Sequence, residues 1–163
     1  DTGGGIYCMN GSSPSLDGCT FTNNSTNVGQ GLGTSGGGIA CYDNSNPTIT
    51  NCTFQSGYAN DGGGIYCNDS SPTIMNCVIT NNTAKYNGGG FYCKGSSSPI
   101  VEDCTFSNNS TEIASGGGLH CFGSASPIVS SCIFLGNESA WDGGGVFCSS
   151  ASLVLNNCLF DSN

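Results

Sequence analysis

The sequence predicts an all-β protein, a right-handed parallel β-helix solenoid of six coils. Three observations carry the prediction: a Gly-Gly-Gly-apolar-x-Cys motif that occurs six times, a second cysteine ten or eleven residues after each of these, and apolar residues that recur in short alternating runs. A repeat of about 26 residues cannot bury its own apolar side and must stack on its neighbours. Three short strands and three turns use up such a repeat. We therefore expect a single solenoid domain over residues 1–163.

Each coil is expected to begin with the glycine triplet and the first strand. The triplets start at Gly3, Gly36, Gly62, Gly88, Gly116 and Gly143. In the strand that follows, the apolar residue and the cysteine share parity, so both are predicted to point inward and the residue between them outward. The outward column reads Tyr7, Ala40, Tyr66, Tyr92, His120 and Phe147. It predicts an exposed aromatic ladder, beside a flat outer strip made by the third glycine of each triplet.

The second and third strands are expected on either side of the second cysteine. All five prolines stand five residues before that cysteine, where proline opens a short strand after a turn. The positions three before and two after it are apolar in all six repeats. Three residues beyond the latter column stand Asn24, Asn82, Asn109, Asn137 and Asn163, with Gly57 as the exception. These asparagines predict a ladder of hydrogen-bonded side chains along the axis.

Composition excludes several kinds of partner. Two Lys, no Arg and 11 acidic residues give a formal net charge of −9, and 36% of residues are hydrophobic. A chain of this charge lacks the basic surface that binds nucleic acid or an anionic membrane. No apolar run of about 18 residues is present, so no membrane insertion is expected. The absence of a signal peptide and of an initiator Met predicts a mature or excised segment.

Twelve cysteines, an even number, predict disulfide bonds and an oxidising compartment. They form six pairs, one in each coil: Cys8/Cys19, Cys41/Cys52, Cys67/Cys77, Cys93/Cys104, Cys121/Cys132 and Cys148/Cys158. We expect each pair to be bonded within its coil. The competing interpretation pairs stacked cysteines of one column, because the strand spacing also lies within the permitted Cα range of about 4.4–6.8 Å. Cys-x-x-Cys spacings are absent and one histidine cannot complete the usual zinc sites, so no metal or cofactor is expected.

Sequons recur in the turn that holds the asparagine ladder. Asn23, Asn81 and Asn108 each lie one residue before a ladder position and are predicted to face outward. Outward asparagines in sequons are good glycan acceptors in a eukaryotic secretory pathway. The ladder residues Asn82 and Asn109 are predicted to stay bare, because their amides are engaged with the coils above and below.

Two aspartates form the best carboxylate pair. Asp43 and Asp69 both follow a first-strand cysteine by two residues in adjacent coils, so their Cα atoms should lie about 5 Å apart. They are a weak candidate for calcium or for the acid and nucleophile of an enzyme. We favour two solvated turn residues, because no arginine and no third acidic residue accompany them. His120 has no identifiable nucleophile partner, and we favour an exposed stacking role over that of a general base.

The repeats carry a family resemblance. GGxI-type and Phe-x-x-Asn motifs that recur in one unit resemble the repeats of the chlamydial polymorphic outer membrane proteins and of related protist and bacterial β-helix proteins. The resemblance covers essentially the whole chain. It implies a pectate-lyase-like right-handed β-helix with a surface-exposed, adhesive or structural role.

We therefore expect a non-enzymatic structural protein that is secreted or at the cell surface. It would be a glycosylated β-helical rod, one segment or subunit of a longer fibre or surface appendage, that assembles end to end with copies of itself or with further β-helix repeats. The first alternative is an adhesin-like module that binds glycans or protein through the aromatic ladder. The second is a pectate-lyase-like carbohydrate-active enzyme with Asp43 and Asp69 in its site.

Overall fold

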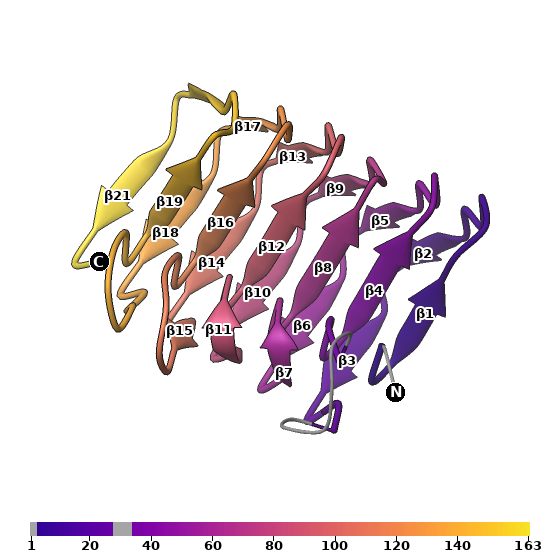
Figure 1. Cartoon of the computed structure of the whole chain (residues 1–163), viewed down its shortest axis with the longest axis horizontal. Coiled ribbons are helices and arrows are strands. Elements are labelled where there is room, and N and C mark those ends of the chain that lie inside the picture. Colours follow the sequence, from indigo (N-terminus) through magenta and orange to yellow (C-terminus); the bar gives the residue numbers. More distant parts are fainter. Residues whose placement is uncertain (1–2, 28–33) are drawn as a thin grey trace.

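The computed structural model describes residues 3–27 and 34–163 and confirms the all-β parallel solenoid (Figure 1). Successive coils stack along the long axis of the molecule, and the N- and C-terminal coils lie at opposite ends (Figure 1). The described residues include no helix that is long and apolar enough to cross a membrane.

Three parallel sheets of six strands run along the solenoid, as the repeat predicts. The first sheet contains β1 (Ile6–Cys8), β4 (Ile39–Tyr42), β8 (Ile65–Asn68), β12 (Phe91–Lys94), β16 (Leu119–Phe122) and β19 (Val146–Ser149). The second contains β2 (Ser15–Asp17), β5 (Thr48–Thr50), β9 (Thr73–Met75), β13 (Ile100–Glu102), β17 (Ile128–Ser130) and β20 (Val154–Asn156). The third contains β3 (Thr20–Thr22), β6 (Thr53–Gln55), β10 (Val78–Thr80), β14 (Thr105–Ser107), β18 (Ile133–Leu135) and β21 (Leu159–Asp161).

A fourth sheet, which the repeat pattern did not predict, connects the middle coils. It contains β7 (Tyr58–Asp61), β11 (Thr83–Asn87) and β15 (Ser110–Thr111). These strands lie between the asparagine ladder and the next glycine triplet, where the sequence varies most in length. They pair because the solenoid already holds the neighbouring segments one strand spacing apart.

The interior consists of columns of like residues that stack along the axis. Ile39, Ile49 and Phe54 are fully buried, and the equivalent residues of the following three coils are buried as well. The phenylalanine rings of the third sheet stack nearly face to face, with centroids 4.7 Å apart for Phe21 and Phe54 and an angle of 2° between the rings. That spacing is the strand separation of a parallel sheet. Sheet geometry therefore sets the ring stacking.

The asparagine ladder forms as predicted. The Asn82 amide Nδ2 donates to Oδ1 of Asn109 at 2.9 Å, and the Asn109 amide donates to Oδ1 of Asn137 at 2.9 Å. The second hydrogen of each amide goes to a backbone carbonyl of the previous coil, that of Phe54 for Asn82 and that of Ile79 for Asn109. All three asparagines are fully buried. Each side chain thus satisfies backbone groups in the turn that would otherwise lack partners.

The glycine triplet is required by close approach between coils, and our interpretation of its third member was wrong. At Gly62 the φ angle is +63°, a left-handed conformation that favours glycine. A Cβ atom on Gly64 would lie 2.7 Å from the Gly90 carbonyl oxygen and 3.1 Å from the Asn82 amide. The third glycine therefore faces the buried asparagine ladder and forms no outer strip. Strand alternation would point the third glycine outward, but the left-handed first glycine of the triplet interrupts that alternation.

We predict that the asparagine ladder stabilises the fold. Replacing Asn109→Ala should lower the free energy of unfolding in urea by about 2–4 kcal/mol, because it leaves buried donors and acceptors of two neighbouring coils unpaired. Asn108→Gly is the matched control, since Asn108 is exposed and has a φ of +52° that glycine tolerates. Equal effects of the two substitutions would contradict a structural role for the ladder.

Candidate functional site

The aromatic ladder forms on the outer face of the first sheet, but the prediction that it is exposed was wrong. The exposed fractions are 2% for Tyr66, 5% for Tyr92 and 4% for His120, and only Tyr7, at 42%, is clearly exposed. Segments that precede the glycine triplets lie against this face, since Asn87, Ser115 and Asp142 line the same space as Tyr92 and His120. The ladder is therefore mostly a second, smaller core on the outside of the sheet.

Tyr42 completes the ladder where Ala40 interrupts it, and the sequence analysis missed it. The Tyr42 ring lies 5.6 Å from that of Tyr7 and 5.0 Å from that of Tyr66, measured between centroids. From Tyr66 the rings continue through Tyr92, His120 and Phe147 at separations of 5.7, 4.8 and 4.9 Å. Tyr42 stands two residues after Ala40, so strand alternation predicts that both side chains lie on the same outer face.

His120 acts as a member of this packed row. Burial lowers the pKa of its imidazole to about 4, against a weaker opposing contribution from the Ser115 backbone. The neutral ring packs against Tyr92 on one side and Phe147 on the other. At neutral pH an imidazole with this pKa is a weak base, which agrees with the stacking role expected from the sequence.

A pocket of about 330 Å³ opens where the ladder reaches the last two coils. Tyr92, His120 and Phe147 form its floor, and its other lining residues are Asn87, Ala114, Ser115, Phe122, Trp141, Asp142 and Ser149. Trp141 is 73% exposed. The repeat pattern predicts no role for Trp141, because this residue lies in the segment before a glycine triplet, outside every repeated column. The pocket combines a flat apolar ring with a carboxylate, an amide and hydroxyl groups.

The cysteines form two columns, and in the structure all twelve are free thiols. The first column, in the first sheet, contains Cys8, Cys41, Cys67, Cys93, Cys121 and Cys148, and the second, at the turn between the second and third sheets, contains Cys19, Cys52, Cys77, Cys104, Cys132 and Cys158. Second-column thiols satisfy the backbone of this turn. Cys52 donates to the Thr50 carbonyl at 3.1 Å, and its sulfur accepts the backbone N–H of Cys19 at 3.4 Å. Disulfide bonding within a coil stays a prediction.

Asp43 and Asp69 are exposed turn residues with φ angles of +52° and +51°. One carboxylate oxygen of Asp69 accepts the backbone N–H of Ser96 in the next coil at 2.9 Å. Within the described ranges, no three metal-ligating side chains gather at one place. The aspartates therefore act as turn residues here, as the sequence analysis favoured.

The sequon asparagines and the ladder asparagines face opposite ways, as predicted. Asn23, Asn81 and Asn108 are exposed and have φ angles of +54°, +54° and +52°. Asn82 and Asn109 are fully buried. A single left-handed residue thus turns one asparagine of each pair outward and its neighbour inward.

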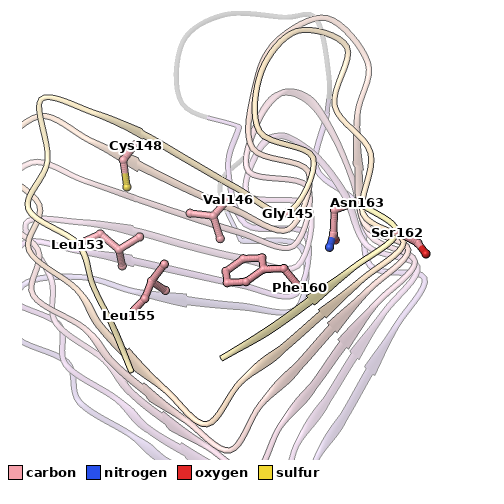
Figure 2. Close-up of a pocket in the computed structure, with 8 residues that line it drawn as sticks. All are labelled: Gly145, Val146, Cys148, Leu153, Leu155, Phe160, Ser162 and Asn163. Atoms are coloured by element: carbon pink, nitrogen blue, oxygen red, sulfur yellow. The ribbon is translucent and has the colours of Figure 1, made fainter. Parts of the chain in front are cut away.

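The last coil presents the cross-section of the core at its outer end. Val146, Leu153, Leu155 and Phe160 point into the space enclosed by the coil, and Cys148 points toward them (Figure 2). The exposed fractions are 45% for Phe160 and 42% for Leu155, whereas Phe134 and Val129 in the coil below are fully buried. A further coil in register would cover these side chains in the same way.

Two protein families match the chain. The family described as right handed beta helix region matches residues 1–98, which is more than half of the sequence. The chain belongs to this family. The Chlamydia polymorphic membrane protein repeat matches residues 103–121 and 131–149 of this β-helix protein, and these repeats indicate a cell-surface protein. No curated protein and no solved structure matches the chain.

We predict glycans on the exposed asparagines alone. When the chain is secreted by a eukaryotic cell, at least some of Asn23, Asn81 and Asn108 should carry N-linked glycan and Asn109 should not, because the Asn109 amide is buried and hydrogen-bonded on both sides. Enzymatic deglycosylation in ¹⁸O water followed by peptide mass spectrometry locates each site. Asn108→Gln serves as the control for the Asn108 peptide. Glycan on Asn109 with none on Asn108 would contradict the inward and outward assignment.

Proposed function

We propose that this chain is a non-enzymatic structural segment of the cell surface, a β-helical rod that extends by stacking coil on coil. The register of the coils is the observation that carries the proposal, since each coil bonds to the next through the same three sheets. The apolar columns and the amide ladder of the interior continue into the coil that contains Phe160, where the Asn163 Oδ1 accepts from Asn137 at 2.7 Å. The first coil of another copy, or a further β-helix repeat, offers the complementary surface. Such stacking is how solenoids bury their cores.

The geometry of the side faces also supports a structural role. The best carboxylate pair, Asp43 and Asp69, consists of exposed turn residues, and His120 is a packed neutral ring. Neither arrangement supplies the paired acid and base that glycoside hydrolysis needs. By contrast, the ladders of asparagine, phenylalanine and aromatic rings all reinforce the contact between coils.

End-to-end stacking predicts concentration-dependent self-association. Sedimentation velocity should show oligomers that grow with protein concentration, and electron microscopy should show rods. Phe160→Asp should abolish association, because it places a carboxylate on the apolar cross-section. Leu159→Asp is the matched control, since Leu159 is 55% exposed in the same strand but lies on the side face. Monomers at every concentration would contradict end-to-end stacking.

A second candidate function, an adhesin-like glycan-binding module, is favoured by the pocket at Trp141. Trp141 is exposed, and a tryptophan ring can stack on the apolar face of a sugar. Asp142, Asn87 and Ser115 line the same pocket and offer hydrogen-bonding groups for hydroxyls. The net charge of −9 opposes anionic sugars. We therefore propose neutral glycans as the ligands of this pocket.

The fluorescence of Trp141 can report glycan binding, because Trp141 is the single tryptophan of the chain. Titration with neutral oligosaccharides should shift its fluorescence, and Trp141→Ala should reduce the affinity measured by calorimetry at least tenfold. Tyr86→Ala is the control, because Tyr86 is an exposed aromatic residue outside the pocket lining. An unchanged spectrum across a panel of neutral oligosaccharides would contradict this candidate.

A further inference from the structure

The proposed rod does not account for the twelve cysteines, although they occupy two positions in every coil. In the first sheet, cysteines of consecutive coils are direct register partners, for example Cys8 with Cys41 and Cys67 with Cys93. Adjacent parallel strands lie about 4.8 Å apart, which falls within the Cα separations that a disulfide bond spans. Stacking therefore brings each thiol next to its equivalent in the neighbouring coil.

The columns bring each cysteine next to its equivalent in the neighbouring coil. In the first column, the register continues from Cys41 to Cys67, from Cys93 to Cys121 and from Cys121 to Cys148. In the second column, the backbone N–H groups of Cys19, Cys52 and Cys77 each donate to the sulfur of the cysteine one coil further on, at 3.4 Å. Each of these sulfur atoms thus lies against the neighbouring cysteine of its column.

The two cysteines of one coil are separated by the strand of the second sheet. In the last coil, the side chain of Cys148 points toward Leu153 and Leu155, and these two leucines project into the enclosed space (Figure 2). Cys158 follows this strand, and its thiol donates to the backbone carbonyls of Asn156 and Val129. A bond within the coil would have to cross the apolar column that fills the interior.

We propose that the cysteines form disulfide bonds between consecutive coils, along each column, in place of the bonds within coils that the sequence favoured. In the first column the pairs are Cys8–Cys41, Cys67–Cys93 and Cys121–Cys148, and in the second Cys19–Cys52, Cys77–Cys104 and Cys132–Cys158. Only this arrangement bonds neighbours and pairs all twelve. The inference holds whether the chain is a rod or a binding module.

This connectivity groups the six coils into three disulfide-linked pairs. Two bonds would join the first coil to the second, two the third to the fourth, and two the fifth to the sixth. The second and third coils, and the fourth and fifth, would be connected by the peptide chain, by hydrogen bonds and by the apolar columns, without a disulfide bond. The bonded residues are 26 to 33 positions apart, against ten or eleven within a coil. Longer loops constrain the unfolded chain more strongly.

The chemistry is thiol–disulfide exchange with a small disulfide oxidant, such as oxidised glutathione. One cysteine thiolate attacks the oxidant, breaks its S–S bond and releases one glutathione thiolate. The second cysteine thiolate then attacks the mixed disulfide, forms the protein S–S bond and releases the second glutathione. Two protein thiols are oxidised, and one disulfide is reduced to two thiols.

The burial of the first-column cysteines determines the stage of folding at which the disulfide bonds can form. Cys41, Cys67, Cys93 and Cys121 are fully buried in the folded solenoid. An oxidant can therefore reach them only before neighbouring coils close over them. We expect the bonds to form while the coils assemble in an oxidising compartment.

The first test uses the unmodified chain, refolded in a buffer of reduced and oxidised glutathione. Peptide mapping by mass spectrometry without reduction should find Cys8 linked to Cys41 and Cys77 linked to Cys104. Linkage of Cys8 to Cys19 would overturn the proposal in favour of bonds within coils. Twelve alkylatable thiols in the refolded, then denatured, protein would also overturn it.

The second test determines the register through Cys67→Ser, which leaves one partner without a bond. Alkylation after unfolding in guanidinium should label Cys93 alone. Labelling of Cys41 would mean that the register is shifted by one coil, and labelling of Cys77 would mean bonds within coils; either result overturns the proposal. The double variant Cys67→Ser/Cys93→Ser is the control and should show no free thiol. If the single variant does not fold, the map of the unmodified chain decides.

Discussion

The strand spacing of about 4.8 Å along the axis is the constraint on which the rest of the structure depends. Backbone groups of the strands bond from one coil to the next, as the Ile65 N–H does to the Gly90 carbonyl at 2.9 Å, so equivalent residues lie directly above one another. The nearest neighbours of a side chain along the axis are therefore the equivalent side chains of the coils before and after it. The stacked columns accordingly consist of residues whose copies attract each other at this distance, namely flat rings, amides that both donate and accept hydrogen bonds, and thiols.

Each inward column meets a requirement of the coil at one place, such as a hydrogen-bond partner for buried backbone groups or space for a close approach. Asparagine satisfies the buried backbone of one turn, as Asn82 does by accepting the N–H of Gly57 at 2.8 Å. Cysteine does the same for the turn between the second and third sheets, where the Cys52 sulfur accepts the N–H of Cys19 and its thiol donates to the Thr50 carbonyl. Glycine allows the first strand to approach the amide ladder. Stability is thus spread over many equivalent contacts and is not concentrated in one core.

The same regularity separates the two candidate functions in space. The proposed stacking would use the coil face on which Phe160 and Leu155 present the core columns. The proposed glycan binding would use the side, where the segments before the glycine triplets differ in length and place Trp141 and Asp142 beside the aromatic ladder. The two surfaces share no lining residue, so the two proposals are compatible in one protein of the β-helix family.

The sequence by itself determined the repeat, the three parallel sheets, the inward columns and the inward and outward members of each asparagine pair, because alternation and axial stacking are local rules. Tertiary structure decided what lies against the outer face. It turned the third glycine of each triplet inward, because the left-handed first glycine breaks the simple alternation of the strand. It also buried Tyr66, Tyr92 and His120 and formed the pocket at Trp141. These last outcomes depend on how the irregular segments before the glycine triplets fold over the first sheet, and such packing has no period that the spacing of residues along the chain could reveal.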